Sequence, residues 1–139
     1  MDCVETAAGT TMYLLVFVRG ANLFMGDVHV AQGDGELCGG GLDITAEVTL
    51  EFDRIPAKRI EWLRLKNEEY LMVAARARPL MDAFRLAQVE LIRWLEQDYG
   101  YDPLNALHLI TQVGITRVGN VVDPQFTVVP KFPKRYLPG

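Results

Sequence analysis

Hydrophobic and polar residues alternate most regularly between Leu42 and Phe52, in the stretch LDITAEVTLEF. Apolar side chains occupy every second position, and charged or hydroxyl-bearing side chains occupy the positions between them. A period of two places the two kinds on opposite faces of an extended chain, so the segment predicts a half-buried β-strand. An earlier stretch, Thr10 to Val18, is rich in β-branched and aromatic residues and predicts a buried strand.

A helical period replaces this alternation after Pro79. Apolar residues recur three and four positions apart at Leu80, Phe84, Ala87, Leu91, Ile92 and Leu95. Because proline is well tolerated in the first turn of a helix, the pattern predicts a helix over 79–98. Asp102 is a good N-cap for a second helix over 103–113, and Gly114 ends that helix.

Shorter strands are predicted on either side of the two helices. They cover 59–65 and 69–75, joined by a turn at 66–68, and 114–122 and 125–130, joined by a turn at Asp123-Pro124. The chain lacks the repeated crossovers that a parallel sheet requires. We therefore predict one α+β domain over residues 1–139, with a largely antiparallel β-sheet and a two-helix hairpin inserted before the last strands.

The composition excludes several classes of protein. Half of the 139 residues are hydrophobic and 23% are charged, as in an ordered globular domain. The net charge of -4 argues against a nucleic-acid partner. The apolar run from Met12 stops at Arg19, well short of the ~18 to 20 residues of a membrane helix, so we expect no membrane partner. Residues 1–20 show no secretory signal, and a cytoplasmic location is the expectation.

A dense group of metal-binding residue types lies in GDVHVAQGDGE, residues 26–36. If this part of the chain is extended, Asp27 and His29 point to the same side, because side chains alternate along a strand. Carboxylate oxygens and imidazole nitrogens are ligands of zinc and similar divalent cations. Asp34 and Glu36 share the same alternating relation, so the segment could serve one metal ion or two.

Other readings of the same residues stay open. An Asp-Gly pair such as Asp34-Gly35 is common at a hairpin tip, where nothing need be bound. The chain has no serine, which excludes Ser/His/Asp hydrolysis, whereas a Cys38 and His29 pair remains conceivable. The glycines lack the lysine of a phosphate-binding loop and do not lie between a strand and a helix. The second histidine, His108, is expected to be a packing or surface residue within its helix.

The string GDVHVAQGDGELCG resembles the acetamidase/formamidase family, whose motif runs close to Asn-Met-Asp and then Gly-Asp-Gly-His-Ala-Ala-Gln-Gly-Asp-Gly-Glu. Met1-Asp2, LDITAEVTLEF and the closing TRVGNVVDPQFTVVPKFP extend the similarity over nearly the whole chain. The resemblance implies hydrolysis of a short linear amide, formamide or acetamide, to ammonia and a carboxylic acid. It also implies a divalent metal as cofactor, with zinc expected.

Site residues follow from this resemblance by position. The implied metal ligands are Asp2, Asp27, His29, Glu36 and Asp43. The implied catalytic carboxylates are Glu36, which would take the proton of water and return it to the leaving amine, and Asp34. Two departures bear on this set: Asp43 stands where the family tends to have glutamate, and Val28 replaces the usual glycine, which reduces backbone freedom beside His29.

The similarity corresponds to the C-terminal half of longer family members. The resemblance therefore implies either a homo-oligomer or a partner chain that supplies the family's N-terminal half. The alternative is a truncated, non-catalytic domain of the same fold that binds a metal ion or another protein.

Overall fold

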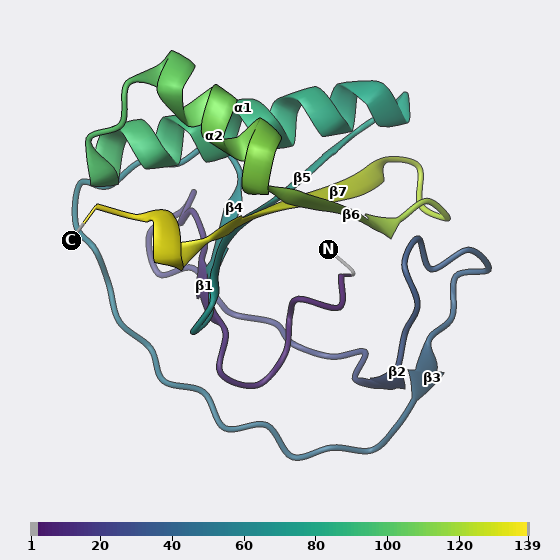
Figure 1. Cartoon of the computed structure of the whole chain (residues 1–139). Coiled ribbons are helices and arrows are strands. Elements are labelled where there is room, and N and C mark those ends of the chain that lie inside the picture. Colours follow the sequence, from purple (N-terminus) through teal and green to yellow (C-terminus); the bar gives the residue numbers. More distant parts are fainter. Residues whose placement is uncertain (1–2, 139) are drawn as a thin grey trace.

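The computed structural model describes residues 3–138 and contains a five-stranded antiparallel sheet with two helices on one face (Figure 1). The strands of this sheet are β1 (Thr11–Tyr13), β4 (Leu63–Lys66), β5 (Tyr70–Ala77), β6 (Ile115–Asn120) and β7 (Phe126–Pro133). Their order is β1-β4-β5-β7-β6, and each neighbouring pair is antiparallel. The helices are α1 (Leu80–Tyr99) and α2 (Pro103–Val113). The predicted α+β class is confirmed.

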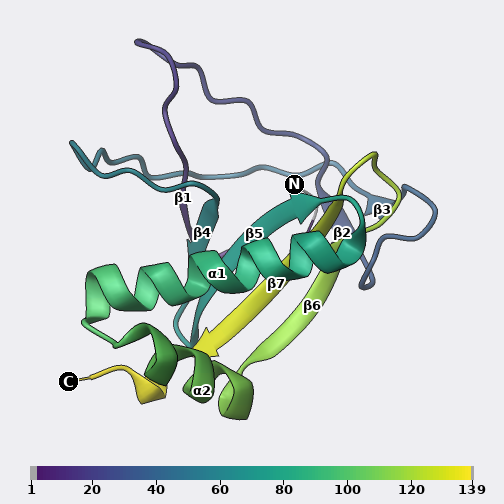
Figure 2. The ribbon, with the colours of Figure 1, turned by 90° about the horizontal axis from the view of Figure 1, so that it is seen from above.

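A separate two-stranded hairpin lies beside the β6–β7 end of the sheet (Figures 1 and 2). Its strands are β2 (His29–Ala31) and β3 (Leu42–Asp43), and one turn of 3-10 helix, η1 (Lys134–Tyr136), follows β7. The hairpin carries the predicted metal-binding segment. Because the hairpin lies next to β6, residues of β6 can contact that segment.

The main core lies between the sheet and α1. Ala83, Ala87, Leu91 and Leu95 of α1 are fully buried against Leu71, Val73, Val128 and Phe132 of the sheet. Leu80 and Phe84 were expected on this face from their spacing, but they are 38% and 40% exposed. Small alanine side chains face the sheet instead, which lets the helix axis approach the strands closely. Asp102 caps α2 as predicted, because its Oδ1 accepts hydrogen bonds from the next helical backbone N–H groups.

A buried ion pair joins β4 to α1. Arg64 Nη2 lies 2.7 Å from Glu90 Oε1, and both side chains are 2% exposed. The Arg64 guanidinium also donates to Gln97 Oε1 and lies over the Trp94 ring. These partners together offset the cost of removing the arginine charge from water. The ion pair also fixes the orientation of α1 on the sheet.

Two predicted strands are much shorter than the sequence pattern indicated. The Thr10 to Val18 segment forms a strand only over β1, and the Leu42 to Phe52 segment only over β3. A strand needs backbone partners, and the remaining residues have no neighbouring strand within the described chain. Figure 1 shows the second segment continuing as a long extended connection far from the sheet. The predictions of full-length strands were wrong for that reason.

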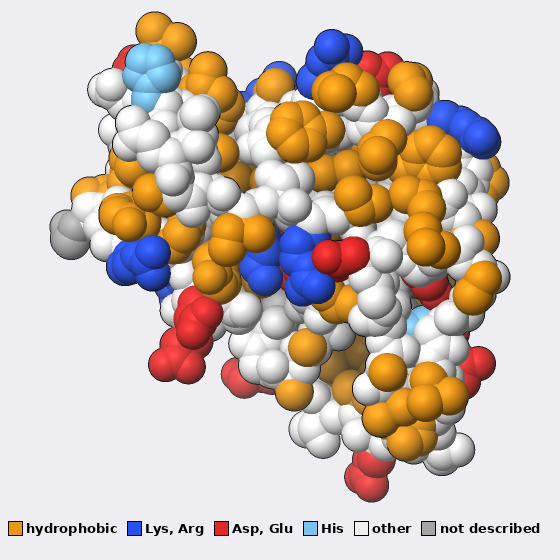
Figure 3. Space-filling view, turned by 45° about the vertical axis from the view of Figure 1, so that its right-hand side comes forward, with side chains coloured by type: hydrophobic (Ala, Val, Ile, Leu, Met, Phe, Trp, Pro, Cys, Tyr) orange, Lys and Arg blue, Asp and Glu red, His pale blue; other side chains and the backbone are white. Residues whose placement is uncertain are grey.

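Both segments expose the apolar side chains that the pattern had assigned to an interior. We call these side chains, together with the exposed apolar side chains that follow each segment, the open apolar surface; it consists of Leu14, Val16, Phe17, Val18, Leu23, Phe24, Met25, Leu42, Ile44, Val48, Leu50, Phe52 and Ile55. Phe17 and Phe24 are 86% and 88% exposed. Figure 3 shows hydrophobic side chains gathered over the helices and again around a hollow in the lower part of that face. Within residues 3–138, neither helix has the length and apolar character needed to cross a membrane.

Candidate functional site

The hairpin of β2 and β3 brings a histidine and two aspartates together. His29 and Asp43 face each other in the antiparallel register, and a bulge follows between His29 and Ala31. Asp27 precedes β2 with a φ of 59°, a left-handed conformation that is uncommon outside glycine and tends to occur at functional positions. This backbone turns the Asp27 carboxylate back toward the imidazole.

His29 Nε2 lies between the two carboxylates. It is 3.2 Å from Asp27 Oδ1 and 3.2 Å from Asp43 Oδ1. The three possible ligand atoms lie within 4.8 Å of one another. The imidazole is mostly buried at 8% exposure, whereas the two carboxylates are 65% and 79% exposed. The cluster therefore presents a fixed nitrogen at the bottom and two oxygen donors at an open rim.

Gln32 holds the other imidazole nitrogen. His29 Nδ1 is 3.0 Å from Gln32 Oε1, and because an amide oxygen can only accept, this contact is a hydrogen bond when Nδ1 carries the proton. Nε2 then lies within hydrogen-bond distance of the Asp27 carboxylate and at the same distance from that of Asp43, and it is the ring nitrogen that would face a cation held between them. The hydrogen bond to Gln32 is also the main reason that the pKa of His29 is raised above its ordinary value; the charges of Asp27 and Asp43 add to it, and desolvation opposes it.

Gly41 packs directly against the imidazole ring. A Cβ at this position would lie 2.4 Å from His29 Nδ1 and 2.5 Å from His29 Cγ, distances that no real side chain allows. At the neighbouring Gly40, a Cβ would meet nothing within 4 Å. Glycine is required at Gly41 because the backbone approaches the ring closely, and this contact fixes the plane of the imidazole.

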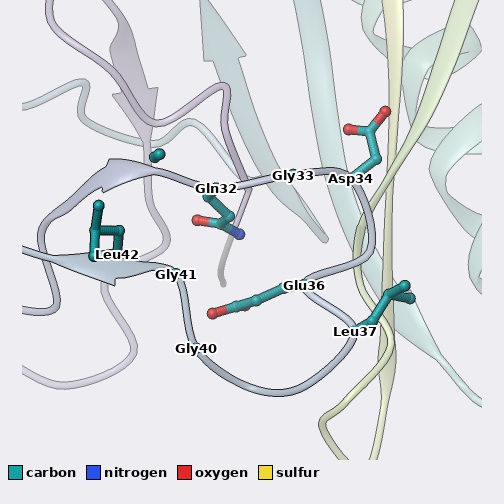
Figure 4. A pocket seen from close by; sticks show the side chains of 9 residues that line it. Gln32, Gly33, Asp34, Glu36, Leu37, Gly40, Gly41 and Leu42 are labelled. Atoms are coloured by element: carbon teal, nitrogen blue, oxygen red, sulfur yellow. The ribbon is translucent and has the colours of Figure 1, made fainter.

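A cavity of about 520 Å³ adjoins the hairpin and contains the two other predicted carboxylates among its lining residues. Figure 4 shows Glu36 pointing across the loop that joins Gly33 to Gly41, whereas Asp34 points away from the cavity, toward β6 and β7. Glu36 is 9% exposed. Its Oε2 accepts a hydrogen bond from Asn120 Nδ2 at 2.8 Å.

Asp34 forms an ion pair with β6. Arg117 Nε lies 2.9 Å from Asp34 Oδ1, and Arg117 Nη1 lies 3.6 Å from Glu5 Oε1. The hydrogen bond and charge of Asp34 raise the pKa of Arg117 further above its ordinary value. Lys131 Nζ is 3.5 Å from the same Glu5 oxygen. Asp34 therefore anchors its loop to the sheet, and Glu36 is left as the carboxylate that lies within the cavity.

The structure brings together Asp27, His29 and Asp43 of the predicted ligands. Glu36 lies outside that group of ligand atoms, in the adjoining cavity, and Asp2 lies outside the described residues. The Cys38 Sγ contacts the carbonyl of Gly40, and His108 is exposed on α2, as expected for a surface residue. Sequence reasoning missed Gln32, Gly41, Arg117 and Asn120.

Gln32 gives the first prediction. Replacing it with leucine removes the acceptor of the Nδ1 proton, so the ring can rotate and its tautomer is no longer fixed. We expect zinc affinity of the purified chain to fall by about 10- to 100-fold, as is usual when the outer hydrogen bond of a metal-binding histidine is removed. Competition against a chromophoric chelator measures this. Gln112→Leu on the exposed surface of α2 is the control, and equal affinities for the two variants would contradict the assignment.

Comparison with known proteins gives the context of this geometry. A sequence profile described as the Acetamidase/Formamidase family matches residues 1–78, which is more than half of the chain and includes the whole hairpin. The chain belongs to the acetamidase/formamidase family.

Solved structures of this family share the fold over nearly the whole chain. An acetamidase from Yersinia enterocolitica is 40% identical with a TM-score of 0.96, and it covers 100% of this chain. A predicted acetamidase/formamidase from Thermoanaerobacter tengcongensis is 28% identical with a TM-score of 0.90 and covers 97%. An acetamidase from Bacillus halodurans is 29% identical with a TM-score of 0.80 and also covers 97%.

The chain is much shorter than these family members. It spans 42%, 45% and 46% of the three solved chains, in the same order. A protein of Schizosaccharomyces pombe, provisionally named a formamidase, is 35% identical over 72 residues, which are 50% of this chain and 17% of that protein.

Proposed function

We propose that this chain forms the metal-binding part of a hydrolase that converts a short linear amide, such as formamide or acetamide, to ammonia and a carboxylic acid. The observation that carries the proposal is the fixed imidazole of His29 between two carboxylates, beside a cavity that holds the Glu36 carboxylate. Family membership and the names of the solved relatives support amide hydrolysis as the class of reaction.

The residues present fit a divalent cation. One imidazole nitrogen and two carboxylate oxygens within 4.8 Å form a donor set that zinc accepts, and catalytic zinc sites commonly keep a further position open beside three protein ligands. Gln32 accepts the Nδ1 proton, so Nε2 is the ring nitrogen that would bind the cation. Zinc is the first candidate, with Asp27, His29 and Asp43 as its ligands.

The chain's own residues divide the reaction between binding and proton transfer. A bound divalent cation supplies Lewis acidity and makes a water nucleophile accessible near neutral pH. Glu36 takes one proton from the attacking water, whose oxygen forms the new bond to the amide carbon. Glu36 then gives that proton to the nitrogen as the carbon–nitrogen bond breaks, and ammonia leaves. Asp34 holds the loop of Glu36 through its ion pair with Arg117.

We propose that the open apolar surface is covered by the part of the family fold that this chain lacks. Exposed apolar area of this extent is typical of a surface that packs against another protein or domain. The chain aligns over its full length with 42% of the Yersinia enterocolitica acetamidase. The part of the family fold that corresponds to the rest of that protein is our candidate for the layer that covers the open apolar surface. The unpaired segments after β1 and β3 fit strands that gain backbone partners from that part. The alternative is that a second copy of this chain packs on the open apolar surface, and the experiment below distinguishes the two.

Complementation tests the proposed reaction. The chain is co-expressed with the portion of the Yersinia enterocolitica acetamidase that it does not cover, and ammonia release from formamide and acetamide is measured. We expect metal-dependent release from the complex, and a loss of about 100- to 10,000-fold in Glu36→Gln with the metal content unchanged.

The outcomes distinguish the hydrolase from the binding domain. Release that is unaffected by Glu36→Gln would contradict the role of Glu36. A complex that binds metal but releases no ammonia from either amide would favour a non-catalytic interaction domain. A chain that self-associates and excludes the added portion would assign the open apolar surface to a homo-oligomer.

A further inference from the structure

We propose that Asn120 of β6 is a positioning residue for Glu36, holding one carboxylate oxygen so that the other is free to meet water or substrate in the cavity. The proposal rests on the proposed function, because it takes Glu36 as the group that transfers the proton. Asn120 lies outside residues 1–78, the part of the chain that the family profile matches.

The Asn120 side chain is buried and its amide orientation is determined. It is 1% exposed, and its Oδ1 accepts a hydrogen bond from the backbone N–H of Asp123 at 3.1 Å. A backbone N–H can only donate, so the oxygen of the amide must face Asp123 and the nitrogen must face Glu36. The 2.8 Å contact from Nδ2 to Glu36 Oε2 is therefore a donor contact with a fixed direction.

A bulge in β6 precedes Asn120 and accompanies its contact with Glu36. Val118 pairs with Val128, but Asn120 pairs with Thr127, so β6 contains one extra residue between these positions. Such a bulge redirects the side chains that follow it, and bulges often occur beside active sites. Without the extra residue, the alternation of the strand would direct this side chain differently relative to β7.

The backbone of the Glu36 loop is bound to the same stretch of strand. Gly35 N–H donates to Val118 O at 2.7 Å, and Val121 N–H donates to Gly35 O at 2.8 Å. Glu36 itself has a φ of 41°, a left-handed conformation that a glutamate adopts only when its surroundings require it. Two backbone bonds therefore hold the loop, and the Asn120 amide holds the carboxylate at its end.

The contacts of Glu36 suit a positioning role for Asn120. Among residues 3–138, the carboxylate has one hydrogen bond, and its donor is this neutral amide. The neighbouring cation, Arg117, is bound to Asp34 and Glu5 instead. Asn120 therefore orients Oε2 while Oε1 has no protein donor within the described chain.

Asn120→Asp isolates this contact. The aspartate keeps an oxygen that accepts from Asp123 N–H, but it replaces the donor that faces Glu36 with a second carboxylate oxygen. In the complemented complex we expect kcat to fall about 10- to 100-fold, with KM and metal content unchanged, because the base is misplaced and the metal ligands are not. Asn120→Ser, which retains a shorter donor, should lose less. Asn105→Asp on the exposed surface of α2 is the matched control.

A spectroscopic measurement on the chain alone separates this proposal from the proposed function. In the 15N NMR spectrum, the Asn120 side-chain amide should exchange with solvent much more slowly than that of Asn105, and its resonance should move in Glu36→Gln. Equal exchange for the two amides would overturn the proposal.

Equal kcat for Asn120→Asp and Asn105→Asp, in a complex whose turnover needs Glu36, would overturn it too. A slow Asn120 amide in a complex without turnover would support the positioning contact and contradict the hydrolase.

Discussion

Replacing Gly41 with alanine should weaken zinc binding by about 10- to 100-fold or more, the loss that follows when the support of a metal-binding histidine is removed. The added methyl group would lie 2.4 Å from His29 Nδ1, 2.5 Å from Cγ and 2.8 Å from Cε1, so the ring must leave its place. Moving the ring also breaks the hydrogen bond to Gln32, which fixes the tautomer. Isothermal titration calorimetry with zinc measures the change.

Gly40→Ala is the matched control for this substitution. The two glycines are neighbours, neither has a left-handed φ, and a Cβ at Gly40 meets nothing within 4 Å. The control should keep the wild-type affinity, because the methyl group has room. If Gly40→Ala and Gly41→Ala bind zinc equally well, the imidazole is not held as the structure describes.

Glu90→Ala should produce the largest loss of stability, about 3–5 kcal/mol in the free energy of unfolding. The substitution removes the carboxylate that lies 2.7 Å from the Arg64 guanidinium, which is buried at 2% exposure, and among the described residues leaves only the more distant and more exposed Asp98 carboxylate at 4.0 Å. Urea unfolding followed by circular dichroism measures the effect. The control is Glu61→Ala, which removes the exposed partner of Arg93 and should cost about 0–1 kcal/mol.

A double variant tests the cause of that loss. Arg64→Met with Glu90→Leu removes both charges and retains apolar volume, so no buried charge is left unpaired. We expect the double variant to be more stable than Glu90→Ala alone. If it is less stable, packing of the arginine over Trp94 and its bond to Gln97 dominate, and the unpaired charge is not the main cost.

The sequence predicted those elements whose determinants are local. Both helices follow from apolar spacing, and the second begins where Asp102 caps it. The pair of β4 and β5 and the pair of β6 and β7 follow from short strands joined by turns. The face of α1 could not be placed as well, because Leu80 and Ala83 are both apolar, and the distance to the sheet decides which of them is buried.

The two long strand predictions failed because a strand is not a local property. The LDITAEVTLEF pattern predicts an extended segment with one apolar face. It does not indicate whether the residues that pack on that face belong to the same chain. Within the described residues no layer covers this segment, and its alternating apolar side chains lie in the open apolar surface. The pattern therefore indicated an apolar face correctly, although it did not predict where the strand ends.

The sequence located the segment that carries the candidate site, but it did not predict the contacts between the residues of the site. The Asp27 and His29 pair follows from spacing of two, and Asp43 comes from the resemblance alone. Gln32 lies three residues after His29 and could have been considered as its hydrogen-bond partner. Asn120 is 84 residues from Glu36, and its contact depends on a bulge that no sequence pattern indicates.

Zinc binding by the purified chain, compared between wild type and His29→Ala, tests the central claim most directly. Equilibrium dialysis followed by elemental analysis gives the bound metal, and far-UV circular dichroism verifies that both proteins are folded. The account predicts that the wild-type chain retains zinc and that His29→Ala loses it, because within residues 3–138 the cluster then keeps only the two exposed carboxylates. A folded wild-type chain without zinc, or a His29→Ala variant that retains as much zinc as wild type, would contradict it.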